Sequence, residues 1–111
     1  MAIDNSLYDS LENTYVKINN YFENNKLGPE HSAMIINHEE LSILLETLDI
    51  EALEEQSTDI HALHNALNNI KVVSEQIIID LDDTTDSNAS ATKVVNGLKE
   101  IFSKISNLQV S

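Results

Sequence analysis

The chain has no cysteine, no tryptophan and no arginine, and it has only two glycines and one proline among 111 residues. Without cysteine it can form no disulfide, no zinc–thiolate site and no thiol nucleophile. Without arginine it lacks the side chain that best makes bidentate contacts with phosphate or carboxylate groups. Gly28 and Gly97 are too few for a glycine-rich phosphate loop, and no GxSxG motif is present. We therefore expect a protein that is not an enzyme and that uses no cofactor and no metal.

The chain also lacks a stretch long and apolar enough to span a membrane. Its N-terminus has neither the basic nor the apolar region of a signal peptide. Apolar residues make up 41% of the chain and charged residues 23%, which is typical of a folded globular protein. We therefore expect one soluble, cytoplasmic domain over residues 1–111 that has no membrane role.

Basic residues are scarce, and the middle of the chain has none. Six lysines face 19 acidic residues, which gives a net charge of −13. Nine acidic residues lie between Lys26 and Lys71, with no basic residue among them. Such a surface repels phosphate backbones and anionic lipids, so it argues against direct nucleic-acid binding and against membrane binding. It favours a basic protein partner.

We interpret eight acids of this region as the candidate partner-binding residues. They are Glu39, Glu40, Glu46, Asp49, Glu51, Glu54, Glu55 and Asp59. In a helix Glu51 and Glu55 lie one turn apart with Glu54 beside them, a spacing close to that of successive phosphates along a nucleic-acid strand. The pattern favours an inhibitor (an immunity protein, an antitoxin or a nucleic-acid mimic) or a secretion chaperone. The alternative is that these acids form only a solvated helix face.

The longest apolar-periodic run, residues 58–83, predicts the central helix. Its apolar stripe has alternating spacings of three and four residues, and it comprises Ile60, Leu63, Leu67, Ile70, Ser74, Ile77 and Leu81. No glycine or proline interrupts the run. We expect this helix to be contacted on several sides, with Leu67 buried in the middle of the stripe.

Three further helices are predicted, at residues 6–23, 29–56 and 89–108. The second is either one helix or two, because Asn37 followed by Glu40 resembles a capping box and Asp49 marks another irregularity. We interpret Gly97 in the last helix as a point of close packing rather than a break. Short connections favour antiparallel neighbours, so the sequence predicts an all-α, up-and-down antiparallel four-helix bundle.

Two of the predicted helices carry more apolar residues than one four-helix core needs. The additional residues are Val72, Val73, Ile78, Ile79, Val95 and Phe102. A homodimer is therefore a form of association that the sequence leaves open.

Histidines and an aspartate cluster are candidate metal ligands. His61 and His64 are three residues apart and could project from adjacent turns, but this common spacing is more typical of two partly exposed helix residues. His38 falls on an apolar stripe and is interpreted as a hydrogen-bonded core histidine. The aspartates at 80–86 lack the glycine and the final glutamate of an EF-hand loop, so we expect a solvated loop there.

The stretch HALHNALNNI, residues 61–70, resembles the histidine-phosphotransfer (HPt) motif. In that family a helix of a four-helix bundle presents a phosphorylated histidine followed by x-Leu-Lys-Gly. The resemblance implies a signalling module with His61 as the phosphate acceptor. Here His64 stands at the position of the family's lysine, and Asn65 at that of its glycine.

Overall fold

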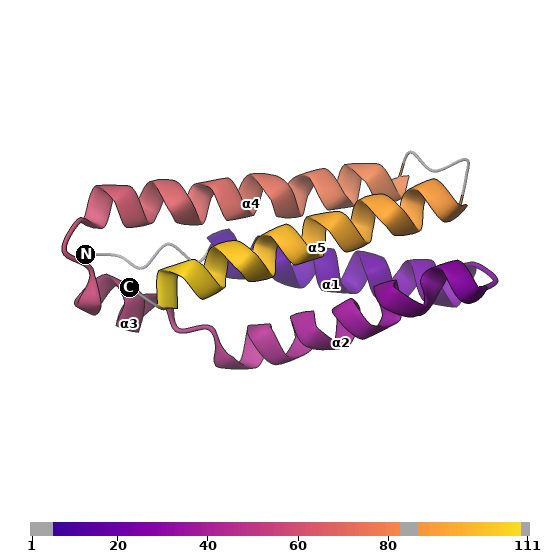
Figure 1. The fold of residues 1–111 in the computed structure, drawn as a ribbon, viewed down its shortest axis with the longest axis horizontal. Helices are drawn as coiled ribbons and strands as arrows, with labels where there is room; N and C mark the ends of the chain where they lie inside the picture. The colour runs from indigo at the N-terminus through magenta and orange to yellow at the C-terminus, as the bar shows by residue number, and fades with distance from the viewer. Residues whose placement is uncertain (1–5, 83–86, 110–111) are drawn as a thin grey trace.

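The computed structural model describes residues 6–82 and 87–109, and these residues form an all-helical structure (Figure 1). The elements are α1 (Ser6–Asn24), a short 3-10 helix η1 (Pro29–His31), α2 (Ser32–Thr47), α3 (Ile50–Gln56), α4 (Ile60–Asp82) and α5 (Ser87–Gln109). The four long helices lie side by side along a molecule of 46 × 22 × 20 Å, and α3 lies at one end (Figure 1). No helix in the described ranges is both long and apolar enough to cross a bilayer.

The long helices make four extensive contacts, which are α1 with α2, α1 with α4, α4 with α5, and α2 with α5. Successive long helices point in opposite directions, so α1 runs parallel to α4 and α2 runs parallel to α5 (Figure 1). Within the described residues, α2 and α4 do not form such a contact. The expectation that successive helices pack as neighbours therefore fails for this pair. In the chain, α3 lies between these two helices.

Two helices, α2 and α3, occupy the region that the sequence left as one helix or two. The backbone is extended at Leu48 and Asp49, and the Asp49 carboxylate caps α3 by accepting from the N–H of Ala52 at 3.0 Å. Tyr8 of α1 holds this break in place. Its hydroxyl donates to the carbonyl of Leu48 at 2.7 Å and accepts from the N–H of Ile50 at 3.1 Å. The break at Asp49 is therefore fixed both locally and by α1.

The capping box expected at Asn37 is not present. Asn37 is buried inside α2, and its side-chain amide donates to the carbonyl of Ala33 at 2.9 Å. At the start of α4 the cap is Asp59, whose carboxylate accepts from the N–H of Ala62 at 3.1 Å. Residues 83–86 of the expected solvated loop lie outside the described residues.

The predicted apolar stripe of α4 lies in the core. Its buried members are Leu63, Leu67, Ile70, Ser74, Ile77 and Leu81. Small polar side chains mark the contact with α1, where the hydroxyl of Thr14 donates to the carbonyl of Ser10 at 2.9 Å and the hydroxyl of Ser74 donates to the same carbonyl at 3.0 Å. Buried hydroxyls with such partners do not carry the cost of an unsatisfied polar group.

Gly97 lies where α5 approaches α4 most closely. A Cβ atom at this position would stand 2.6 Å from Cγ1 of Ile77, well inside van der Waals contact. The interpretation of Gly97 as a close-packing point is therefore confirmed.

Candidate partner-binding surface

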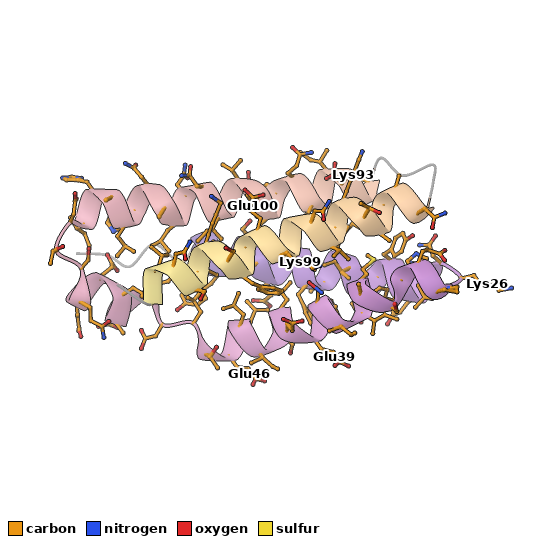
Figure 2. All side chains as sticks on the ribbon, viewed as in Figure 1. Lys26, Glu39, Glu46, Lys93, Lys99 and Glu100 are labelled. Carbon is orange, nitrogen blue, oxygen red and sulfur yellow. The ribbon has the colours of Figure 1, made fainter. Side chains whose placement is uncertain are left out.

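Seven of the eight candidate carboxylates are exposed, and five of these seven have no hydrogen-bond or ion-pair partner within the described residues. The five come from two helices. On α2 they are Glu39, Glu40 and Glu46, and on α3 they are Glu51 and Glu55. Glu39 and Glu46 are seven residues apart, and both point away from the other helices (Figure 2). The exposed acids therefore extend along the outer side of α2 and continue onto α3 at the end of the molecule.

The other three candidate carboxylates have partners within the chain. Asp49 and Asp59 cap α3 and α4. The side chain of Glu54 is only 17% exposed, and its Oε2 accepts from Nε2–H of His64 at 2.9 Å. Glu54 is therefore less accessible to a partner than Glu51 and Glu55, because it is turned towards His64 of α4. These three carboxylates therefore hold the local structure together, as helix caps or as a hydrogen-bond acceptor.

The outer side of α2 is also apolar, which the sequence analysis did not single out. Ile36 and Ile43 are 58% and 59% exposed, and their seven-residue separation places them on the same side of the helix. The opposite side of α2 is buried through Met34 and Leu41. A helix that is apolar on two sides has an unpartnered face. The feature of the sequence that could have indicated this face is the run of apolar residues beside the buried stripe of α2; no motif marks it.

A groove runs between α2 and α5 beside this face. It has a volume of about 250 Å³ and is lined by Glu40, Ile43, Leu44, Thr47, Phe102, Ile105 and Ser106. The groove therefore combines apolar side chains with a carboxylate from α2.

The lysines of the described residues do not pair with the carboxylates of this surface. The lysine ion pairs join Lys17 with Asp82 at 3.5 Å and Lys104 with Glu100 at 3.9 Å, and neither pair includes a residue of α2 or α3. In the described part of the chain, none of the five exposed carboxylates of α2 and α3 has an ion-pair partner. Their field is therefore directed towards solvent and towards any approaching cation.

His38 fixes the inner side of α2 against α1. It is buried, its Nε2–H donates to the carbonyl of Tyr15 at 3.1 Å, and its ring stacks on that of Tyr15 at 4.1 Å and meets the edge of Phe22 at 5.2 Å. Burial lowers the pKa of His38, although the Tyr15 carbonyl and the charge of Glu39 oppose this shift. The interpretation of His38 as a hydrogen-bonded core histidine is confirmed.

His31 is a second buried histidine, and no pattern in the sequence pointed to its burial. Its side chain is fully buried, Nδ1 accepts from the N–H of Gly28 at 3.0 Å, and Nε2 lies 3.0 Å from the hydroxyl of Tyr21. Because Nδ1 accepts a hydrogen bond, the proton of the neutral ring lies on Nε2 and points to Tyr21. His31 and His38 together position α2 so that its isoleucines and glutamates face outwards.

The two histidines of α4, His61 and His64, do not share a binding site. His61 is exposed in the first turn of α4, whereas His64 is engaged by Glu54. In the described residues, no group of three or more histidine or carboxylate side chains is placed to hold a metal ion. The structure thus gives His61 and His64 different surroundings.

The residues that suggested a homodimer separate into two groups. Val73, Val95 and Phe102 pack against the core and Ile78 is partly buried, whereas Val72 and Ile79 are 56% and 57% exposed on α4. Only part of the apolar excess therefore reaches the surface.

Comparisons of the chain with protein-family models, with curated proteins and with solved structures find no match.

Proposed function

We propose that this protein is a non-enzymatic binding protein whose acidic surface on α2 and α3 engages a basic protein partner. Within this class, inhibition is favoured, by an immunity or antitoxin protein or by a nucleic-acid mimic, with a secretion chaperone as the other biological role. The proposed setting is the cytoplasm. The scaffold of the proposal is a four-helix bundle made by α1, α2, α4 and α5, in which successive long helices alternate in direction, with α3 extending its acidic side.

One observation carries the proposal: exposed isoleucines alternate with unpaired glutamates along the outer side of α2. Exposed charges alone would be consistent with a solvated face. Ile36 and Ile43, each more than half exposed, leave apolar area in water that a partner would cover. Among the residues that the structure describes, the carboxylates around them form no ion pair. Apolar contact would supply affinity, while the carboxylates would steer a basic surface into place.

A pair of charge-matched variants tests the proposal. The first variant replaces Glu39, Glu46, Glu51 and Glu55 by Gln. The control variant removes the same charge from exposed acids of α1 and α4 through Asp9→Asn, Glu12→Gln, Glu23→Gln and Glu75→Gln. Immobilised wild type, first variant and control are incubated with extract of the source cells, and the retained proteins are quantified by mass spectrometry.

We expect wild type and control to retain the same basic protein and the first variant to lose it. Equal retention by both variants would show that the acids of α2 and α3 serve solubility only. Circular dichroism establishes that each variant is folded. Substitution of exposed carboxylates should leave stability unchanged or slightly raised, because it relieves like-charge repulsion.

The exposure of His61 favours a second candidate function, phosphotransfer by an HPt-like module. A phosphate acceptor must be reachable by a donor, and His61 lies at the surface of α4 whereas His64 is held by Glu54. Incubation with a small phosphodonor such as phosphoramidate, or with a kinase and response regulator, tests this candidate. An acid-labile phosphate that is lost in His61→Gln supports it, and absence of label on the wild type removes it.

A further inference from the structure

The side of the molecule formed by α2 and α5 has an apolar centre. The two helices are in contact and run in the same direction, with the groove of about 250 Å³ between them (Figure 1). Ile43 borders this groove from α2 and Phe102 borders it from α5. Ile36 lies two turns before Ile43 on the same side of α2 and remains exposed.

The two helices of this side carry opposite charge. Helix α2 has three glutamates and no lysine, whereas α5 has three lysines and one glutamate. Glu40 lines the groove from α2, one turn before Ile43. Lys99 occupies the corresponding position on α5, one turn before Phe102. Figure 2 shows Lys99 in the same middle section of the molecule as Glu39 and Glu46.

Both of these side chains are available to a partner. Glu40 and Lys99 are exposed, and neither has an ion-pair partner in the part of the chain that the structure describes. The α2–α5 side therefore presents an apolar strip with a free negative charge on one edge and a free positive charge on the other.

We propose that the α2–α5 side binds a second copy of this chain through a two-fold axis parallel to the helices. Such an axis places α2 of one copy against α5 of the other and keeps every residue at its own level along the helices. Glu40 of each copy then lies level with Lys99 of the second copy, and the apolar strips meet between the two ion pairs. The surface is complementary to itself in charge as well as in polarity.

Charge excludes the other two-fold arrangement of the same side. An axis perpendicular to the helices would set α2 against α2, so the edge of one copy that carries Glu40 would meet the same acidic edge of the other. Like charges brought together in this way oppose association. The exposed pair Val72 and Ile79 on α4 lies on a different helix and does not contribute to this interface.

The interface is small, so we expect weak association. Helix α2 has 16 residues, which corresponds to about 24 Å of helix. Two adjacent helices, each about 10 Å wide, give a face of about 480 Å² per copy, below the area typical of a tight complex. The dimer and the basic partner would both cover Ile36 and Ile43, but they would use different charged residues, because Glu39 and Glu46 point away from the other helices (Figure 2).

Complementary charge variants test the pairing between copies. Sedimentation equilibrium at about 0.15 M salt is run on the wild type, Glu40→Lys, Lys99→Glu and an equimolar mixture of these two variants, up to about 1 mM protein. Each variant alone places like charges opposite each other at both sites. The dissociation constant of its dimer should therefore be at least about tenfold higher than that of the wild type. In the mixture, a dimer with one copy of each variant has both pairs complementary again, so dimers should return.

Glu39→Lys is the matched control, because it makes the same charge change on the neighbouring residue outside the groove. It should dimerise like the wild type. Ion pairing within one chain cannot explain the return of dimers in the mixture, because mixing leaves each chain unchanged. Circular dichroism on each variant shows that it is folded. A monomeric wild type up to about 1 mM, single variants that dimerise as the wild type does, or a mixture no better than its components would each overturn the proposal.

Discussion

Helices α4 and α2 are both rich in apolar residues, but these residues have different surroundings in the two helices. Helix α4 places its stripe against α1 and α5, where hydroxyls of Thr14 and Ser74 and the small Gly97 allow close approach. Helix α2 buries one side and leaves Ile36 and Ile43 in solvent next to unpaired glutamates. The difference indicates that the contacts of α4 supply stability, whereas the outer side of α2 is free to bind. The predictions below test this division, from the largest expected effect to the smallest.

The sharpest contrast is between one buried and one exposed apolar residue. Leu67 of α4 is 9% exposed and Ile43 of α2 is 59% exposed. Leu67→Ala should lower the free energy of unfolding by about 2 to 5 kcal/mol, because it leaves a cavity in the core. Ile43→Ala should change it by less than about 0.5 kcal/mol, since little buried area is lost. Urea denaturation of both variants measures this contrast, and similar losses would show that α2 also stabilises the fold through its outer side.

Gly97→Ala should destabilise the protein although alanine is the better helix former. The new Cβ would lie 2.6 Å from Cγ1 of Ile77, so α4 and α5 must separate or Ile77 must leave its rotamer. Overpacking of this kind costs about 1 to 3 kcal/mol, which outweighs the gain of about 1 kcal/mol in helix propensity. Thermal unfolding followed by circular dichroism tests the sign. A raised melting temperature would mean that the contact between α4 and α5 is looser than described.

Acids that cap helices should differ from acids that face solvent. Asp59→Ala removes the carboxylate that accepts from the N–H of Ala62, and it should cost about 1 kcal/mol. Glu55→Gln removes an exposed carboxylate that has no partner among the described residues, and it should change stability by less than about 0.5 kcal/mol. Chemical denaturation at neutral pH compares the two. Equal effects would contradict the separation of structural from surface carboxylates.

His38 should make the attachment of α2 to α1 sensitive to acid. Its pKa is lowered in the folded protein by burial, so near and below the ordinary pKa of about 6.5 the unfolded chain binds more protons than the folded one. Its contribution to stability is therefore complete above that pH and falls as the pH decreases towards the folded pKa. His38→Phe, which keeps a ring beside Tyr15, should reduce this slope. Denaturation of both proteins between about pH 5 and pH 8 measures it, and an unchanged slope would assign the dependence to other groups.

Periodicity predicted the interior well because burial follows the helical repeat. The stripe of α4 from Leu63 to Leu81, the core position of His38 and the close packing at Gly97 could all be read from spacing and residue type. The path of the chain between α2 and α4 could not. That path depends on Tyr8, whose hydroxyl bonds to the backbone on both sides of Asp49 across some 40 residues of sequence.

The sequence indicated which acids form the candidate surface, but it did not indicate their contacts or the apolar residues beside them. The gap in basic residues singled out eight acids, and seven of them are exposed. Sequence spacing could not show that Glu54 meets His64, because the two lie on different helices. Nor could it show that Ile36 and Ile43 face solvent, because apolar residues beside a buried stripe are usually covered by a neighbouring helix. Which sides of α2 find a neighbour depends on the arrangement of all four long helices.

The central claim is that the carboxylates on the outer side of α2 and on α3 guide a basic partner into place. The most direct test is the association rate constant of the captured partner, measured by surface plasmon resonance from about 0.05 M to about 0.5 M salt. For the wild type we predict a rate that falls steeply with salt, and for the variant with Gln at Glu39, Glu46, Glu51 and Glu55 a slower rate with a shallower dependence. The control variant with the matched changes on α1 and α4 should follow the wild type. If the first variant associates at the wild-type rate and with the same salt dependence, the acidic surface does not guide binding and the proposed function is wrong.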